Sequence, residues 1–215
     1  MLLESLRQDV IACALEAERQ GLCKKGSGNV SAFDPETNLI LITPSGTDRS
    51  LLRPADICVL DGDMRCLEGQ KPSSETLMHL ACYRARPDIR AIVHTHSRFA
   101  SAFAVWGKPV PAIVYEMFSL HPDQGRIPVA PYARPGTQAL AEHVADTLRR
   151  SDVALMARHG AIAAGDSLSD ALRKAGYIEE LAEIYLYTLC IGQGKEPPCF
   201  TQEELDAWQY PDELS

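Results

Sequence analysis

Apolar residues recur along this chain with two different periods, and the changes between them predict its elements. Between residues 2 and 20 they return every three or four positions, and Gly21 follows. This spacing predicts an amphipathic helix that ends at the glycine. Helical spacing also predicts helices over about 137–150, over about 167–191 and from about Arg98. Pro72-Ser-Ser-Glu75 is expected to open another, to about Arg86, because serine caps free amides and glutamate suits a first turn.

Short apolar runs separated by turn residues predict strands elsewhere. Residues 29–33 and 39–43 flank the turn DPETN, and residues 57–60 precede the turn DGD. The largely apolar run at 89–95 predicts a buried strand. We expect further short strands within three segments: 111–116, 126–133 and 153–165.

The composition is that of a folded protein. With 215 residues, 46% hydrophobic and 23% charged, the chain suits a single domain spanning 1–215, with residues 193–215 as a C-terminal tail. The start of the chain has early acids and no long apolar core, and no window resembles a membrane span, so we expect a cytoplasmic protein. Seven cysteines without a CxxC pair favour reduced thiols over a disulfide framework or a thiolate zinc site.

A formal net charge of −8 narrows the classes of partner. Nucleic acids and anionic membranes are bound mainly by lysine and arginine, so neither is expected as a partner. Any phosphate would have to be held by a local arrangement of donors.

Two of the six histidines are one residue apart, in the stretch Ala91-Ile-Val-His-Thr-His-Ser97. Alternate residues of a strand point to the same face, so the side chains of His94 and His96 converge at the end of a buried strand. Such a pair suits a metal, although two hydrogen-bonded histidines without a metal fit the spacing as well.

Two further residues are candidate ligands. His159 interrupts an apolar strand and is followed by Gly160, which allows close backbone approach. Glu75 stands at a helix start, where it also fits an ordinary helix-terminus acid. Together with His94 and His96 they would offer three nitrogens and one carboxylate, a set that fits Zn²⁺ or a similar divalent ion.

The other histidines have no comparable setting. We expect His79 and His143 to lie on helix surfaces or to be partly buried, without ligating a metal. His121 remains open, because the loop that carries it could approach the site.

Three segments share small residues with accessible amides and hydroxyls: Gly26-Ser-Gly-Asn-Val-Ser31, Ser45-Gly46 and Ser73-Ser74. The first is neither a Walker loop nor a dinucleotide fingerprint, and alone it is an ordinary turn. Because the serine pair precedes a predicted helix, whose N-terminus favours anions, the three segments together could hold a phosphate without lysine.

Five motifs in this order and at these separations resemble the class II aldolase/adducin family over about residues 5–192: GSGNVS, ITPSG, KPSSE, VHTHS and RHG. The resemblance implies a three-layer α-β-α fold of the α/β class, with a central, mainly antiparallel sheet. It also implies a homotetramer with metal sites near the subunit interfaces.

The resemblance assigns roles to particular residues. It implies that His94, His96, His159 and Glu75 bind Zn²⁺, one ion per subunit, with Mn²⁺ or Co²⁺ as alternatives, and that Glu75 is also the catalytic base. It implies that Tyr115 exchanges a proton in a neighbouring subunit's site. The substrate phosphate would be held by Gly28, Asn29, Ser45, Gly46, Ser73 and Ser74.

The implied reaction is the reversible cleavage of a ketose 1-phosphate into dihydroxyacetone phosphate and an aldehyde, through an enediolate stabilised by zinc. The ketose would be of the fuculose phosphate type or a 5-deoxy or 5-methylthio pentulose 1-phosphate. The segment MFSLHPDQGR at 117–126 and the tail depart from the family's pattern, and we expect Met117 and Phe118 to leave room for an apolar aldehyde tail.

Two alternatives remain open on the same fold. One is an epimerase, decarboxylase or dehydratase of a related sugar phosphate, because fold alone does not choose among these reactions. The other is a non-catalytic, adducin-like interaction module, in which the metal ligands would not be needed.

Overall fold

A computed structural model describes residues 1–24 and 26–208 of the chain. Its main sheet contains β1 (Asn29–Asp34), β2 (Leu39–Ile42), β3 (Cys58–Leu60), β4 (Cys66–Glu68), β5 (Ala91–Thr95), β8 (Val129–Ala130), β9 (Val153–Met156) and β10 (Gly160–Gly165). A second, two-stranded sheet pairs β6 (Val110–Pro111) with β7 (Arg126–Ile127). The helices are α1 (Glu4–Arg19), α2 (Thr76–Ala85), α3 (Arg98–Trp106), α4 (Gln138–Leu148), α5 (Leu168–Ile191) and α6 (Gln202–Asp206), with 3₁₀ turns η1 (Arg49–Leu51), η2 (Pro54–Asp56) and η3 (Tyr115–Leu120).

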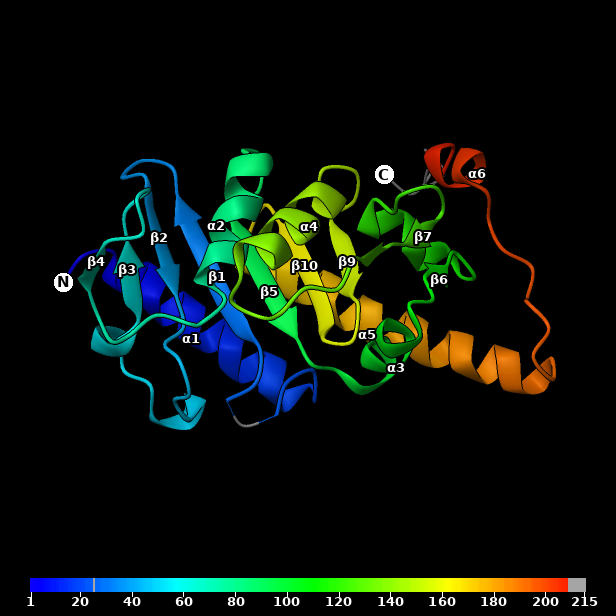
Figure 1. Cartoon of the computed structure of the whole chain (residues 1–215), viewed down its shortest axis with the longest axis horizontal. Helices are drawn as coiled ribbons and strands as arrows, with labels where there is room; N and C mark the ends of the chain where they lie inside the picture. The colour runs from blue at the N-terminus through cyan, green and yellow to red at the C-terminus, as the bar shows by residue number, and fades with distance from the viewer. Residues whose placement is uncertain (25, 209–215) are drawn as a thin grey trace, which may run out of the picture.

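The eight strands lie in the order β4-β3-β2-β1-β5-β10-β9-β8 (Figure 1). Every neighbouring pair is antiparallel except β8 with β9. The central strands β5 and β10 are buried along their whole length. Such strands consist almost entirely of apolar residues, which is why the run ending at Thr95 was recognisable in the sequence.

Helices cover both faces of the sheet. Ala91 and Val93 of β5 belong to the hydrophobic cluster that includes residues of α1, α3 and α5, whereas Ile92 belongs to the cluster that includes α2 and α4. The alternation of side chains along β5 therefore sends successive residues to opposite layers. This confirms the expected three-layer α-β-α arrangement around a mainly antiparallel sheet.

The sequence pattern was wrong between residues 111 and 116. Pro111 is the only residue of this segment in a strand, as the end of β6, and Tyr115–Leu120 forms a 3₁₀ turn. Pro111 has no amide hydrogen to extend the pairing. Met117 and Leu120, which are three residues apart as a 3₁₀ turn requires, are completely buried. Met117 is therefore not available to line a site, contrary to expectation.

The start of α2 also differs from the prediction. The helix begins at Thr76, with Glu75 as its N-cap residue, and no side chain caps it. The serines lie in a turn before the helix, where the Ser73 hydroxyl accepts a hydrogen bond from the Glu75 amide at 3.3 Å. This turn places Ser73, Ser74 and Glu75 beside the strand ends rather than on the helix.

The tail folds back on its own chain as far as Trp208. The Phe200 amide donates to the Ala112 carbonyl at 2.7 Å, and the predicted capping box of Thr201 and Glu204 is present. The Trp208 ring stacks on Tyr115, with centroids 5.3 Å apart. The tail and η3 thus pack as one unit, while residues 209–215 of the predicted tail lie outside the described residues.

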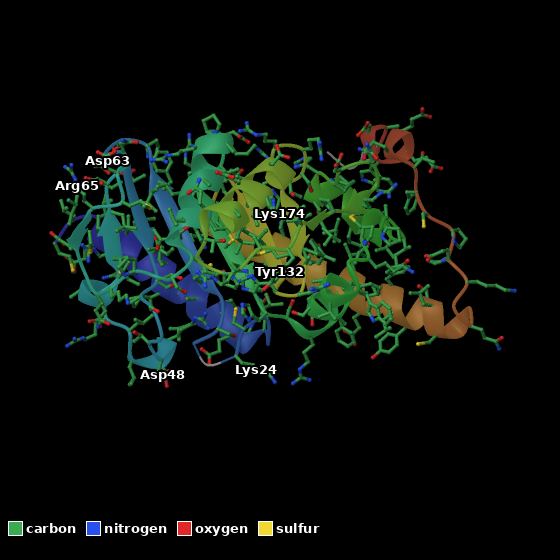
Figure 2. The ribbon with its side chains drawn as sticks, in the orientation of Figure 1. Lys24, Asp48, Asp63, Arg65, Tyr132 and Lys174 are labelled. Atoms are coloured by element: carbon green, nitrogen blue, oxygen red, sulfur yellow. The ribbon has the colours of Figure 1, made fainter. Side chains whose placement is uncertain are left out.

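Charged side chains lie mostly at the periphery, as Lys24, Asp48, Asp63 and Arg65 do in Figure 2. Lys174 of α5 is an exception, since it is buried and pairs with Asp152 at 2.8 Å. No helix in the described part of the chain combines the length and apolarity needed to cross a bilayer.

Candidate metal and anion site

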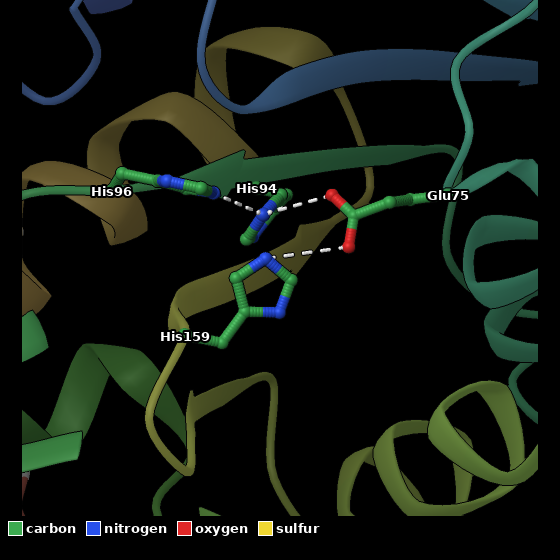
Figure 3. Close-up of side chains that lie close together, drawn as sticks. All are labelled: Glu75, His94, His96 and His159. Carbon is green, nitrogen blue, oxygen red and sulfur yellow. Dashed lines mark hydrogen bonds and ion pairs between the residues drawn. The ribbon is translucent and has the colours of Figure 1, made fainter. Parts of the chain in front are cut away.

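Three separate parts of the fold bring four predicted residues together (Figure 3). His94 lies in β5 and His96 just beyond its end, and alternation turns both toward the layer of α2. Glu75 lies at the start of α2, and His159 lies in the turn between β9 and β10. One candidate ligand atom from each residue lies within 4.8 Å of the others.

The separations suit a single ion. Glu75 Oε2 lies 3.1 Å from His94 Nε2, and Glu75 Oε1 lies 3.4 Å from His159 Nε2. The Nε2 atoms of His94 and His96 are 3.0 Å apart. Ligands bound tetrahedrally at ordinary Zn–N and Zn–O distances lie ~3.3 Å from one another, so these three pairs are spaced nearly as in a zinc shell.

The tautomer of His94 strengthens this interpretation. Its Nδ1 donates to the Ala161 carbonyl at 2.8 Å, so in the neutral ring Nε2 carries a lone pair. That lone pair faces the Glu75 carboxylate and another imidazole nitrogen. Electron pairs at such distances repel one another unless a cation lies between them. The hydrogen bond to Ala161 also fixes the ring orientation, as partners of metal-bound histidines commonly do.

Protonation favours ligation as well. Burial, followed by the nearby charges of His94 and His159, lowers the pKa of His96 to about 4. Burial and the charge of His94 also lower the pKa of His159. Burial by itself raises the pKa of Glu75, but the neighbouring His94 and His159 rings, which attract the carboxylate when they are protonated, and the hydrogen bond from Asn29 outweigh burial and lower this pKa. Neutral imidazoles and an ionised carboxylate are the forms that bind a metal.

Two buried atoms of the cluster have no hydrogen-bond partner among the described residues. These are Glu75 Oε1 and His159 Nδ1. Buried polar atoms are normally paired, and an unpaired carboxylate oxygen costs free energy unless an ion satisfies it. The three imidazoles and one carboxylate that the structure brings together therefore fit a divalent metal ion.

A cavity of about 340 Å³ adjoins the cluster, with walls that include every residue predicted to hold phosphate. Glu75, His96 and His159 also line it, so the cavity reaches the metal cluster. Larger cavities of about 790 and 740 Å³ lie elsewhere and contain none of the four cluster residues.

Glycine is required where the first loop meets β5. Gly28 has a φ of +69°, and a Cβ atom there would lie 2.4 Å from the His94 carbonyl oxygen. Only glycine allows the loop to approach the metal strand this closely.

A buried cation lies behind this loop, and the sequence analysis missed it. Arg49 is 4% exposed and donates through Nη2 to the carbonyls of Ser27 and Gly28, the latter at 3.0 Å. No lysine or arginine is among the described residues lining the cavity, so Arg49 supplies positive charge from behind the loop and not from the cavity wall. An isolated arginine gave no signal in the sequence, because its hydrogen bonds go to backbone carbonyls and the carboxylate that lies 3.8 Å from it, Glu18, is distant in the chain.

Asn29 lines the cavity, but its side chain is engaged inside the protein. Its Nδ2 donates to Glu75 Oε2 at 3.0 Å, and its Oδ1 accepts from His79. His79 is completely buried, contrary to the expected helix-surface position. It stands four residues after Glu75, a helical spacing that could have revealed it.

The remaining predicted residues lie away from the cluster. His121 pairs with Asp152 at 2.7 Å, before β9 begins, whereas His159 follows the end of that strand. His143 is partly buried, and its Nδ1 lies 3.1 Å from the Pro131 carbonyl, so the metal cluster does not include it. Tyr115 is 45% exposed at the start of η3 and does not line the 340 Å³ cavity.

Comparisons with known proteins agree on one family. The profile of the Class II Aldolase and Adducin N-terminal domain matches residues 8–186. The chain is 37% identical to the 5-deoxy-D-ribulose 1-phosphate aldolase of Bacillus thuringiensis serovar kurstaki, over 96% of this chain and 94% of that protein. It is 38% identical to the L-fuculose phosphate aldolase of Escherichia coli, over 93% and 90%. A solved L-fuculose 1-phosphate aldolase superposes with a TM-score of 0.90 at 34% identity, covering 96% of this chain and 95% of that one.

Proposed function

The chain belongs to the class II aldolase and adducin N-terminal domain family, and on that premise we propose that it is a metal-dependent aldolase. It would reversibly cleave a ketose 1-phosphate into dihydroxyacetone phosphate and an aldehyde. This chain aligns with 94% and 90% of the length of the two aldolase relatives, which supports assigning the same type of reaction to it.

The observation that carries the proposal is the cluster of Glu75, His94, His96 and His159 next to an anion-sized cavity. A purely structural module would not need a buried carboxylate oxygen that lacks a hydrogen-bond partner among the described residues beside three imidazoles and such a cavity. This favours an enzyme over an adducin-like interaction module.

Zinc is the metal that we propose for the cluster. Three imidazole nitrogens and one carboxylate oxygen match its common ligands, although Mn²⁺ and Co²⁺ accept the same set. When bound, such an ion supplies Lewis-acid stabilisation of the negative charge that develops on the substrate oxygens.

The phosphate would be bound by neutral donors. Gly28, Ser45, Gly46, Ser73 and Ser74 line the cavity, and their hydroxyls, together with those amides that are not bonded within the protein, would donate to the phosphate. The N-terminus of α2 lies beside it, and its partial positive charge favours an anion. Arg49 adds its charge from behind the loop, without a direct contact.

Glu75 would move the proton at the carbon next to the substrate carbonyl. Its Oε2 accepts a hydrogen bond from Asn29 Nδ2 at 3.0 Å, whereas Oε1 has no hydrogen-bond partner among the described residues. In the condensation direction, the ionised carboxylate first takes this proton, and the electron pair left on the carbon then forms the new bond to the aldehyde carbon. Cleavage returns the proton to the same carbon.

Tyr115 would exchange the other proton, at the oxygen that becomes the aldehyde. Since Tyr115 is exposed and lies outside the cavity of its own subunit, we propose that it serves the site of a neighbour in a homotetramer. The stacking of Trp208 would hold its ring at a defined angle.

For the aldehyde half, we propose a small apolar group, as in a 5-deoxy or 5-methylthio pentulose 1-phosphate. Trp208 stacks on both Tyr115 and Phe118, so η3 and the tail carry an aromatic surface around the proposed acid. Such a surface favours a methyl or thioether over a hydroxylated tail.

A substrate panel tests the proposal. Purified, metal-loaded protein is incubated with 5-deoxyribulose, 5-methylthioribulose and fuculose 1-phosphates, and dihydroxyacetone phosphate is detected by coupled reduction with NADH. We expect triose phosphate from at least one ketose, with the highest kcat/KM for a 5-deoxy or 5-methylthio pentulose phosphate.

Metal-stripped protein and His94→Ala are the controls, and both should lose turnover together with stoichiometric metal. If no ketose 1-phosphate yields triose phosphate, the aldolase assignment is wrong. Release of CO₂, loss of water or inversion of a carbon centre in the same mixtures would identify the decarboxylase, dehydratase or epimerase alternative.

A further inference from the structure

A buried line of polar side chains runs along the contact between α2 and β1 and ends on Glu75. Glu75, His79 and Tyr83 recur every four residues at the start of α2 and along it, and Asn29 and Ser31 alternate along β1. Four residues of helix advance ~6 Å and two residues of strand ~6.7 Å, so the two rows stay in step. All five residues are buried, with at most 6% exposure.

Consecutive members of the line are hydrogen bonded. The Tyr83 and Ser31 hydroxyl oxygens are 2.7 Å apart, and Ser31 Oγ lies 2.7 Å from His79 Nδ1. His79 Nε2 contacts Asn29 Oδ1. Asn29 Nδ2 then donates to Glu75 Oε2 at 3.0 Å.

The carboxylate sets the direction of every bond in the line. An ionised carboxylate only accepts, so Asn29 must present its amide nitrogen to Glu75 and its oxygen to His79. That oxygen also only accepts, so His79 carries its proton on Nε2. The bare Nδ1 of a neutral ring then accepts from the Ser31 hydroxyl, which in turn accepts from Tyr83. All four donors therefore point toward Glu75.

The surroundings keep His79 neutral, as this direction requires. Its ring has no exposed surface, and burial followed by the charge of His94 lowers its pKa to about 3. A charged ring would have to donate from Nδ1 as well, which would reverse the bonds to Ser31 and Tyr83. Aligned hydrogen bonds polarise one another, so the last bond of the line, from Asn29 to Glu75, is strengthened most.

We propose that His79 is a positioning residue, whose Nε2–H fixes the Asn29 amide and thereby holds one oxygen of Glu75 in place at the metal cluster. The inference rests on the proposed function only in that Glu75 is a ligand and base. It assigns the side chain of Asn29 to the carboxylate.

Two isosteric substitutions separate this role from simple packing. Gln in place of His79 puts an amide nitrogen near the position of Nε2, whereas Asn places it near Nδ1. Zinc affinity is measured by competition with a chromophoric chelator, which requires no turnover. We expect His79→Gln to stay within about threefold of wild type, and His79→Asn and His79→Leu to bind zinc ~10- to 100-fold more weakly. At saturating metal, His79→Leu should lower kcat more than it raises KM.

Cys82→Ala is the matched control, because Cys82 is a fully buried residue of the same helix outside the line. It should change zinc affinity by less than about twofold. The proposal is overturned if His79→Leu binds zinc as wild type does, or if the Gln and Asn variants are impaired equally.

A spectroscopic measurement on the wild-type protein tests the proposal even if a variant does not fold. Nitrogen-15 NMR of the wild-type protein, labelled at histidine, should show His79 as a neutral ring protonated on Nε2 near neutral pH. A ring protonated on Nδ1, or on both nitrogens, would overturn the proposal. Both readouts remain valid if no ketose phosphate is cleaved, so a failed aldolase assay and a failed positioning role are distinguishable.

Discussion

The backbone carbonyl of Thr95 occupies the space that a side chain on Gly160 would need. A Cβ atom on Gly160 would lie 2.2 Å from that oxygen and 3.4 Å from the His94 ring. The turn carrying His159 can therefore close against the strand carrying His94 only if residue 160 is glycine.

We predict that Gly160→Ala forces β10 away from β5 and separates His159 from the other ligands. Overpacking of this kind should lower the free energy of unfolding by about 1–3 kcal/mol, and zinc affinity should fall with it. Urea unfolding and chelator competition measure the two effects. Gly62→Ala is the control, because the nearest atom to its added Cβ would be 3.7 Å away. Unchanged zinc affinity in Gly160→Ala would contradict the argument.

Removing the buried charge of Arg49 should weaken binding of phosphorylated substrate. Arg49→Met would keep most of the side-chain volume but lose both the cation and the hydrogen bonds to the Ser27 and Gly28 carbonyls. We expect KM to rise about tenfold, which corresponds to ~1.4 kcal/mol, with the zinc content unchanged.

Steady-state kinetics and inhibition by inorganic phosphate measure this effect, and both constants should shift together. Arg53→Met serves as the control, since that arginine is largely exposed and pairs with Asp56. A normal phosphate affinity in Arg49→Met would show that the amides and hydroxyls of the loops suffice.

Tyr115→Phe should lower kcat by about a hundredfold while leaving zinc binding intact, because only the proton-exchanging hydroxyl is removed. If Tyr115 serves a neighbouring subunit, its loss should be complemented by a subunit that lacks only the metal site.

Mixed oligomers of Tyr115→Phe and His94→Ala, prepared with different tags, test this directly. In a ring with random mixing, about one site in four combines an intact metal cluster with an intact tyrosine, so activity should reappear to that extent. Oligomers mixed from two differently tagged His94→Ala preparations are the control. If the mixed oligomers are no more active than their parents, Tyr115 either acts in its own subunit or has no part in the proton exchange.

The metal-free protein should lose stability on mild acidification. The folded-state pKa values of His79 and His96 are about 3 and 4, below the usual 6.5, because burial disfavours the charged rings. The unfolded chain therefore binds more protons below pH ~6.5, and stability must fall as the pH drops from there toward about 4. Glu75, whose pKa is also lowered, adds to the loss only at pH values below its usual 4.5.

Urea midpoints of chelator-treated protein between pH ~7.5 and ~4 measure this slope. His79→Gln should reduce it, because glutamine does not titrate. A midpoint that is constant across the range would show that neither ring resists protonation.

Much of the site could be predicted from the sequence, because the patterns that indicate it lie within a few consecutive residues. The HxH spacing at 94 and 96 places both imidazoles on one sheet face, and glycine after His159 permits the close approach that the structure requires. The helices and the buried strand at 91–95 follow from the same periodicities. The strand predicted at 111–116 was wrong because a short apolar run has too few residues to distinguish a strand from a 3₁₀ turn.

The sequence by itself determined which way each side chain faces within its own element, since helix and strand periods are properties of a few consecutive residues. Tertiary structure alone decided which element covers each face. It set Glu75 opposite His94, buried His79 between Asn29 and Ser31, placed Arg49 behind the Gly28 loop and laid Trp208 on Tyr115. These contacts join residues far apart in the chain, and their selection depends on how whole layers pack, which no local pattern records.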